Sequence, residues 1–378
     1  MKFVLVPDSF KGTLSASDVC TAMEKGLRKV FPACETVSLP VADGGEGTVD
    51  AFLTALGGKK IAVSVQGPFE KDVSASFALL PDGETAVVEM AACAGLPLVG
   101  TQKDPTRTTT FGVGQLLLSA AAHGAKRIIL GLGGSATNDG GCGAAAACGV
   151  RFFDEDGQSF VPVGSTLSRI ARIDRSGFAP VLRDVKITVM CDIDNPMFGK
   201  TGAAYVFAPQ KGADAACVAM LDEGLCHLSR RITEDIGTDV SAVPGAGAAG
   251  AMGAGMLAFF GAELQSGIRT LLDTADFDRV IADANLIFTG EGKLDGQSLR
   301  GKVISGVCCR AFLQCKPVVA IVGGVSDAEI ESAYGLGLTA VFPINRLPMQ
   351  LTESAPFTAD NICFTAESAA RLLAAAIK

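Results

Sequence analysis

Acidic, basic and hydroxyl residues recur in glycine-rich loops that follow short apolar segments. The first such loop, Asp8 to Thr13, comes directly after the apolar segment Phe3–Pro7. It contains Asp8, Ser9 and Lys11, which would lie at the carboxyl end of a parallel strand, where open α/β sheets bind ligands. A helix cap and a solvated lysine are the alternative, and we favour the ligand site.

Two further loops contain paired carboxylates. Asp43 and Glu46 lie between glycines, and carboxylates suit a hard cation such as Mg²⁺. Glu46 would equally favour the N-terminus of the helix that follows. In the second loop, alternation places Asp192 and Asp194 on one side, where they can hold a metal or accept a proton. An Asx turn before Pro196 would equally account for Asp192 and Asp194. Each of the two loops therefore keeps a functional and a structural interpretation.

The segment from Gly131 to Gly141 gives the strongest local signal of function. It contains five glycines together with Ser, Thr, Asn and Asp. Glycine lets the backbone approach a phosphate closely, whereas an ordinary turn needs only one or two glycines. We therefore predict that this loop binds phosphate through Gly133, Gly134, Ser135 and Asn138.

Two segments come close to known nucleotide motifs. Gly245–Gly250 satisfies G-x-G-x-x-G, but Asp239–Val243 before it is a weak strand candidate. A Rossmann-type NAD(P)-dependent dehydrogenase therefore stays an alternative. The segment Gly296–Val303 nearly spells a P-loop, but Val303 replaces the Ser or Thr that binds Mg²⁺. We reject a true P-loop and keep Lys302 as a phosphate contact.

Histidine chemistry has little support in this sequence. The only two histidines, His123 and His227, have no evident partner nearby in the sequence. Zinc catalysis and a Ser-His-Asp triad are therefore disfavoured. The remaining Asp, Lys, Arg, Ser and glycine loops suit phosphoryl transfer, where catalysis is mostly positioning and charge stabilisation.

Composition excludes several other classes of protein. The 378 residues carry a net charge of −8 and contain no long Lys/Arg cluster, so nucleic acid and anionic membranes are poor partners. The twelve cysteines are scattered without paired spacing, so we expect small buried side chains in a reducing compartment and no disulfide framework. The apolar start ends at Pro7, too early for a signal peptide. We predict a cytoplasmic protein.

The order of expected elements predicts an α/β fold with two domains. Strand, helix, strand and helix follow one another up to Leu56, and the same pattern returns from Leu286. Five parallel strands thus come from both ends of the chain. We predict a doubly wound, Rossmann- or flavodoxin-like domain from residues 1–59 and 285–378, with residues 60–284 inserted as a second α/β domain.

Three further expectations concern individual elements. Short strands at Ile61–Val65, Val73–Leu79 and Thr85–Met90 read as an antiparallel meander. Ser15 is expected to cap the first helix. The terminal helix is expected to begin at about Ala366.

Taken together, the loops resemble those of the bacterial type I glycerate kinase family. The likeness runs from the first strand to the terminal helix, and motifs this long in this order are specific. The segments that carry it are Pro7–Ser15, Ala42–Thr48, Gly131–Gly141, Asp192–Pro196, Pro209–Ala213, Pro244–Gly250 and Thr289–Ser298.

The resemblance implies phosphorylation of D-glycerate by ATP with Mg²⁺, in a cleft between two domains. It favours 2-phosphoglycerate as the product. Roles for single residues are hypotheses from the chemistry. Asp192, ahead of Asp8, accepts the proton of the substrate hydroxyl. Cations hold the substrate carboxylate or the phosphates, and the candidates are Lys11, Lys211 and Lys302, with Ser9 as a further contact. Candidate Mg²⁺ ligands are Asp43, Glu46 and Glu291.

Several points stay open at the level of the sequence. A catalytically silent protein that binds a small ligand remains an alternative beside the dehydrogenase. The sequence does not decide between the 2- and 3-hydroxyl of glycerate. It also leaves the oligomeric state open, a homodimer being one option.

Overall fold

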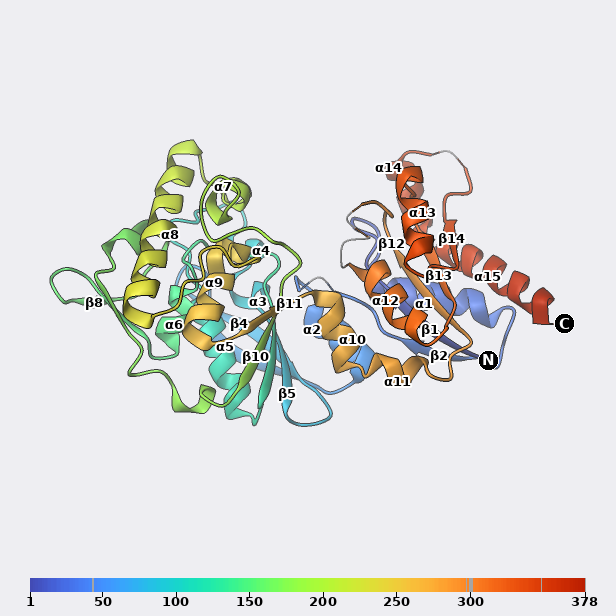
Figure 1. Cartoon of the computed structure of the whole chain (residues 1–378), viewed down its shortest axis with the longest axis horizontal. Helices are drawn as coiled ribbons and strands as arrows, with labels where there is room; N and C mark the ends of the chain where they lie inside the picture. Colours follow the sequence, from blue (N-terminus) through green and yellow to red (C-terminus); the bar gives the residue numbers. More distant parts are fainter. Residues whose placement is uncertain (43, 297, 299–301, 348, 378) are drawn as a thin grey trace. The chain divides into compact units, whose positions relative to one another are not determined.

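The computed structural model describes residues 1–42, 44–296, 298, 302–347 and 349–377 (Figure 1). Two compact units can be described separately. The first comprises residues 1–42, 50–57 and 266–378, and the second comprises residues 43–49 and 58–265. The α/β class predicted from the sequence is confirmed. The predicted domain limits at 59/60 and 284/285 stay a prediction.

The first unit contains a five-stranded parallel sheet in the order β14-β13-β12-β1-β2. Its strands are β1 (Lys2–Pro7), β2 (Glu35–Ser38), β12 (Leu286–Glu291), β13 (Val318–Val322) and β14 (Ala340–Pro343). The apolar run Phe3–Val6 is fully buried, as a central parallel strand requires. Renumbered along the chain, this order is the flavodoxin-like 2-1-3-4-5.

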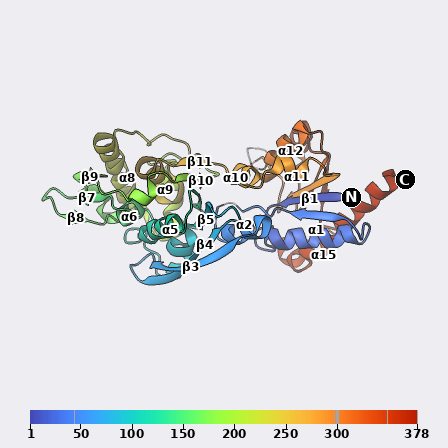
Figure 2. The same cartoon turned by 90° about the horizontal axis from the view of Figure 1, so that it is seen from below.

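Helices cover both faces of this sheet. Figure 2 shows α1 and α15 on one face and α11 and α12 on the other. The core between the sheet and the first pair includes Phe3, Met23, Phe288, Ile321 and Ile362. The helices of this unit are α1 (Ala16–Arg28), α10 (Gly267–Thr274), α11 (Phe277–Ile281), α12 (Val303–Leu313), α13 (Asp327–Gly335), α14 (Leu351–Ser354) and α15 (Thr358–Ile377), and α2 (Thr48–Leu56) has most of its residues there.

The start of the terminal helix corrects an expectation. Helix α15 begins at Thr358, eight residues before Ala366. Its first turns are rich in polar and β-branched residues, which are weak helix formers. They are held by tertiary packing, since Ile362 is buried and a Cβ on Gly26 of α1 would come within 2.3 Å of the Cys363 carbonyl oxygen. Packing of this kind outweighs local propensity.

The second unit contains a six-stranded sheet in the order β11-β10-β6-β5-β4-β3. The four strands from β11 to β5 are parallel, whereas β3, β4 and β5 form the predicted antiparallel meander. The strands are β3 (Lys59–Gln66), β4 (Asp72–Leu79), β5 (Thr85–Glu89), β6 (Arg127–Gly131), β10 (Lys186–Met190) and β11 (Glu263–Gln265).

A smaller antiparallel sheet, seven α-helices and three short 3₁₀ helices complete the described secondary structure of this unit. The small sheet joins β7 (Arg151–Phe153), β8 (Ser159–Phe160) and β9 (Arg172–Asp174). The helices are α3 (Ala91–Ala94), α4 (Leu96–Val99), α5 (Phe111–Ala122), α6 (Cys142–Ala147), α7 (Ala203–Phe207), α8 (Ala215–Ile236) and α9 (Ala248–Phe260). Large buried side chains such as Phe77, Phe152 and Phe259 fill the core.

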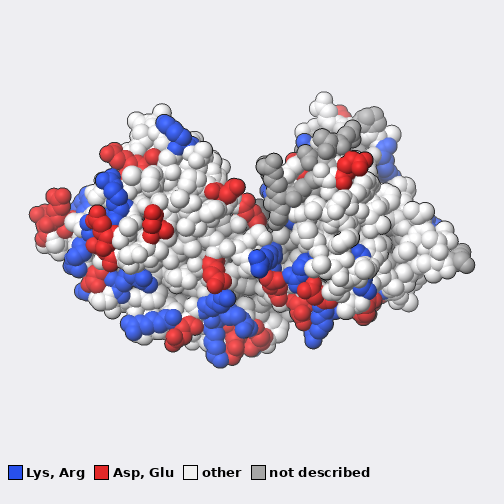
Figure 3. All heavy atoms as spheres, viewed as in Figure 1, with Lys and Arg blue, Asp and Glu red and all other residues white. Residues whose placement is uncertain are grey.

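Acidic and basic side chains are interspersed on the face drawn in Figure 3, and the described residues visible there form no broad basic area. None of the described helices combines the length and the apolar character that crossing a membrane would need.

Candidate functional site

The first unit places charged side chains at the point where its strand order reverses. From β1 the chain passes to β2 on one side, and from β12 it passes to β13 on the other. Open α/β sheets bind ligands at such a switch point, outside the carboxyl ends of the strands. Asp8 follows β1, Glu291 ends β12, and the Asp8 N–H donates to the Gly290 carbonyl oxygen at 2.8 Å.

The loop after β1 is ordered by its own polar groups. Asp8 Oδ1 accepts hydrogen bonds from the Ser9 N–H at 2.6 Å and from Ser9 Oγ at 3.3 Å. Asp8 and Ser9 are half-buried, and Lys11 is exposed. The predicted cap is confirmed, because Ser15 Oγ accepts a hydrogen bond from the Asp18 N–H at 3.2 Å.

Glu291 is the most perturbed acid at this edge. Burial raises its pKa to about 7, a hydrogen bond from Ser298 opposes the rise, and the negative charge of Asp8 adds to it. Lys302, the N-cap residue of α12, lowers the pKa to a smaller degree. Glu291 Oε1 is buried without a hydrogen-bond partner in the protein, which makes it available to a ligand. Residues 297 and 299–301 of the P-loop-like segment lie outside the described residues.

The second unit brings the ends of three parallel strands to one sheet edge. Glu89 of β5, Gly131 of β6 and Met190 of β10 are register partners at the last positions of their strands. The glycine loop leaves this edge after Gly131, and Asp192 follows two residues after Met190. Parallel pairing therefore places the predicted phosphate loop beside the predicted proton acceptor.

Gly44 and Gly45, in the loop before α2, pack against the same glycine loop. The Gly133 N–H donates to the Gly44 carbonyl oxygen at 2.9 Å. A Cβ on Gly131 would lie 2.3 Å from the Gly44 oxygen, and one on Gly133 would lie 2.6 Å from Gly45 Cα. These two glycines are therefore required by contact between two backbones, so their presence does not by itself indicate a phosphate. Gly134 is exposed and has room around it.

Lys211 lies buried beneath the glycine loop. Its side chain donates hydrogen bonds to Ser135 Oγ and to the Thr137 carbonyl oxygen, both at 2.7 Å. Burial lowers the pKa of Lys211 to about 7, and the nearby charge of Asp139 opposes this shift. The structure thus brings Lys211 and Ser135 together, as two of the binding residues predicted from the sequence.

A buried network anchored on Asp139 was not predicted. Its carboxylate accepts hydrogen bonds from the N–H and Oγ1 of Thr110, both at 2.8 Å, and from the N–H groups of Gly141 and Gly143 at 3.1 and 3.2 Å. Burial raises the pKa of Asp139, and these bonds counteract the rise. Thr108 Oγ1 donates to the Ala136 carbonyl oxygen at 2.8 Å. The run of three threonines at 108–110 was the available signal.

Of the other predicted residues, Asn138 is fully buried, and the rest lie at the surface or outside the described part. Asp192 and Glu46 are exposed, and Glu46 belongs to the segment that groups with the second unit. Asp43 lies outside the described residues. Within the described part of the chain, no three His, Cys, Asp or Glu side chains lie close enough to hold a metal together.

The G-x-G-x-x-G segment has a different role from a dinucleotide fingerprint. Strand β10 ends at Met190, and turns precede the segment in place of the strand that the fingerprint requires. Cβ atoms on Gly247 and Gly250 would come within 2.2 Å of the Pro196 oxygen and 2.1 Å of the Thr137 oxygen. Protein backbone therefore occupies the space that a pyrophosphate would need.

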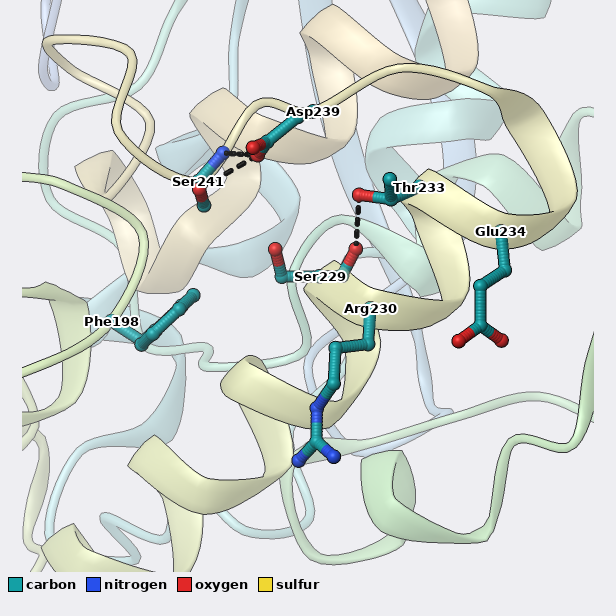
Figure 4. A pocket seen from close by; sticks show the side chains of 7 residues that line it. All are labelled: Phe198, Ser229, Arg230, Thr233, Glu234, Asp239 and Ser241. Atoms are coloured by element: carbon teal, nitrogen blue, oxygen red, sulfur yellow. Dashed lines mark hydrogen bonds between the residues drawn. The ribbon is translucent and has the colours of Figure 1, made fainter.

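A surface pocket lies elsewhere in the second unit, along α8 (Figure 4). Asp239 accepts hydrogen bonds there from the Ser241 N–H at 2.9 Å and from Ser241 Oγ at 2.7 Å. The lining residues are Phe198, Ser229, Arg230, Thr233, Glu234, Asp239 and Ser241, and none of them is a predicted site residue. The pocket therefore contributes no residue to the candidate sites at the two sheet edges.

Comparison with known proteins agrees with the arrangement of the loops. The glycerate kinase family model matches residues 3–374. A glycerate 2-kinase of Escherichia coli K12 is 45% identical over 99% of this chain and 98% of its own length. A glycerate kinase of Bacillus cereus is 45% identical over 98% of this chain and 97% of its own. A crystal structure from Salmonella typhimurium LT2, described as a glycerate kinase 2, superposes with a TM-score of 0.88 at 41% identity, covering 100% of this chain and 99% of that one. The chain belongs to the glycerate kinase family.

Proposed function

We propose that this chain phosphorylates the 2-hydroxyl of D-glycerate with ATP, giving 2-phosphoglycerate and ADP. The observation that carries the proposal is 45% identity over 99% of the chain to a protein described as glycerate 2-kinase. That description also favours the 2-position over the 3-position. Membership of the family supports ATP as the phosphate donor.

The proton acceptor in this proposal is Asp192. It takes the proton of the 2-hydroxyl while the hydroxyl oxygen attacks the γ-phosphorus, and the bond from that phosphorus to the bridging oxygen of ADP breaks. Its exposure at the end of β10 supports the role, because the carboxylate is accessible to a substrate. Asp8 is the second candidate, and Lys11 beside it would neutralise charge on the transferred phosphoryl group.

Phosphate and substrate contacts are proposed from both sheet edges. The exposed backbone of Gly134, with Gly133, would contact phosphate oxygens. Ser9 and Lys302 would do so at the switch point of the first unit. Lys211, Ser135 and Asn138 would act from the glycine loop, where the ammonium is already bonded to the loop. The location of the site in a cleft between two domains stays a prediction.

Mg²⁺ is proposed as the accompanying ion, with Glu291, Glu46 and Asp43 as its ligands. Mg²⁺ bound to nucleotide phosphates needs only one or two carboxylates, so a full cage of protein ligands is not required. The buried Glu291 Oε1, which has no protein partner, fits such a role. When bound, the ion would neutralise developing charge on the phosphates.

The test is ADP release from ATP and Mg²⁺ with D-glycerate, with the product identified by phosphorus NMR. We expect 2-phosphoglycerate. Formation of 3-phosphoglycerate would keep the kinase and overturn the position. Turnover only with another hydroxy acid would overturn the substrate, and no turnover with any hydroxy acid would overturn the function. A cytoplasmic location and the oligomeric state stay predictions apart from this test.

A further inference from the structure

The side chains of two adjacent buried residues of the glycine loop lack hydrogen-bond partners. Thr137 and Asn138 are both 0% exposed. Among the described residues, five buried side-chain nitrogen or oxygen atoms have no partner, and three of these are Thr137 Oγ1, Asn138 Nδ2 and Asn138 Oδ1. Leaving such atoms unpaired costs free energy, so native proteins keep few of them.

The polar groups around this pair are bonded. Thr108 Oγ1 donates to the Ala136 carbonyl oxygen, and Lys211 donates to Ser135 Oγ and to the Thr137 carbonyl oxygen. The Asp139 carboxylate accepts four hydrogen bonds. The unpaired atoms therefore do not reflect a generally loose region, and they remain open to a partner from outside the chain.

A strained turn lies directly on the pair. Ala249, Gly250 and Ala251 have φ values of 56°, 70° and 64°, three consecutive left-handed residues of which two are not glycine. The Gly250 carbonyl oxygen accepts from the Gly140 N–H at 3.0 Å, and a Cβ on Gly250 would lie 2.6 Å from Asn138 Cα. Strained backbone of this kind is concentrated at ligand sites and at segments that move.

We propose that Thr137 Oγ1 and the Asn138 carboxamide form the subsite that recognises the carboxylate and the untransferred hydroxyl of the hydroxy acid substrate. The inference rests on the proposed function and deepens it. Asn138 Nδ2 donates to a carboxylate oxygen, and Asn138 Oδ1 and Thr137 Oγ1 pair with a hydroxyl. The nearby Lys211 ammonium favours an anion. The substrate reaches the pair when the turn at 249–251 shifts.

Isosteric apolar variants separate this proposal from a purely structural role. Thr137→Val and Asn138→Leu remove unpaired polar atoms without emptying the site, so each variant is expected to keep or raise the Tm. Each is also expected to lower kcat/KM for D-glycerate by about 10²-fold or more, because a site built to bond a hydroxyl depends strongly on that bond. The KM for ATP should stay within about twofold. Thr137→Ser, which keeps the hydroxyl, should retain most of the activity.

Thr108→Val is the matched control. Thr108 is also 0% exposed, but its hydroxyl has a protein partner, so the same substitution should lower the Tm. Opposite changes in Tm for Thr108→Val and Thr137→Val are the expected signature. If Asn138→Leu fails to fold, Asn138→Ala serves in its place, since it removes the carboxamide without adding bulk or a buried charge.

Two results would overturn the subsite. One is unchanged kcat/KM for D-glycerate in folded Thr137→Val and Asn138→Leu. The other is a raised KM for ATP with an unchanged KM for D-glycerate, which would assign the pair to the nucleotide. Stabilisation of the wild type by D-glycerate is measured in parallel. Binding of D-glycerate without turnover would refute the proposed kinase function but not the subsite. The subsite would then be tested by binding, which Thr137→Val and Asn138→Leu should abolish. Neither binding nor turnover would refute both.

Discussion

The sheets of the two units present their polar loops in different ways. In the first unit, the loops after β1 and β12 carry charged side chains, with Asp8 half-buried, Lys11 exposed and Glu291 Oε1 unpaired. In the second unit, the loop after β6 is fixed by close backbone contacts and by the buried side chains of Lys211 and Asp139. Side chains determine the chemistry of the first edge, whereas backbone packing determines the shape of the second.

This difference separates two meanings of a glycine-rich loop. Gly12 has a φ of +81° and no atom within 4 Å of a Cβ, so it serves the turn alone. Gly131 serves the contact with Gly44. Both kinds of glycine look alike in a sequence, because only the neighbouring backbone tells them apart.

The largest effect should come from Asp192→Asn. Loss of the proposed proton acceptor is expected to lower kcat by about 10²- to 10⁴-fold. The Tm should hardly change, because the side chain is exposed. Asp194→Asn is the matched control, since Asp194 is exposed on the same loop and should retain near-normal kcat. Steady-state kinetics and a thermal melt check both, and a near-normal kcat for Asp192→Asn would remove this residue from the mechanism.

The glycine comparison gives the next effect. Gly131→Ala is expected to destabilise the protein by about 3 kcal/mol, because the new Cβ meets the backbone of Gly44. Gly12→Ala should cost only about 1 kcal/mol, the strain of a left-handed alanine without a clash. Denaturant unfolding of both variants measures the difference. Equal losses would contradict the distinction between the two loops.

Within a single pH unit, the smallest effects should appear as opposite pH slopes of stability. The raised pKa of Glu291 means that between pH 4.5 and about 7 the folded chain keeps a proton that the unfolded chain has lost, so stability falls as pH rises. The lowered pKa of Lys211 means that between about pH 7 and 10.5 the folded chain has released a proton that the unfolded chain keeps, so stability rises with pH. Each slope is at most about 1.4 kcal/mol per pH unit.

Substitution of Glu291 and of Lys211 tests whether these two residues cause the two pH slopes of stability. Glu291→Gln should remove the fall below pH 7, and Lys211→Met should remove the rise above it. Denaturant unfolding at several pH values measures both relative to the wild type. A Lys211→Met protein that keeps the wild-type slope above pH 7 would show that this ammonium is not held in a low-dielectric site.

Much of the fold followed from local patterns. The strand Val318–Val322 was predicted with the limits it has, and the antiparallel meander and the Ser15 cap were confirmed. Short apolar runs bounded by glycine and proline define such elements without tertiary information. The start of α15 was missed because its first turns are stabilised by contact with α1.

The candidate site was predicted in part. The glycine loop was singled out by its residue types, whereas Lys211 and Glu291 came from the motifs that resemble the glycerate kinase family. The contacts of Thr108 and Thr110 with the glycine loop were missed, because their hydrogen bonds to Ala136 and Asp139 join residues about thirty positions apart. Sequence spacing carries no signal for contacts of that kind.

The sequence by itself determined the alternation of strands and helices, the return of the chain to the first sheet and the family motifs, since each depends on residues near one another along the chain. Only the tertiary structure decided that residues 43–49 group with the second unit and that backbone fills the space beside Gly131 and Gly250. It also decided that the side chains of Thr137 and Asn138 are buried without hydrogen-bond partners. These properties depend on which backbone segments, distant in the sequence, come into contact in the folded chain. Hydrogen bonds and steric repulsion act over a few ångströms in space, whatever the separation of the residues along the chain.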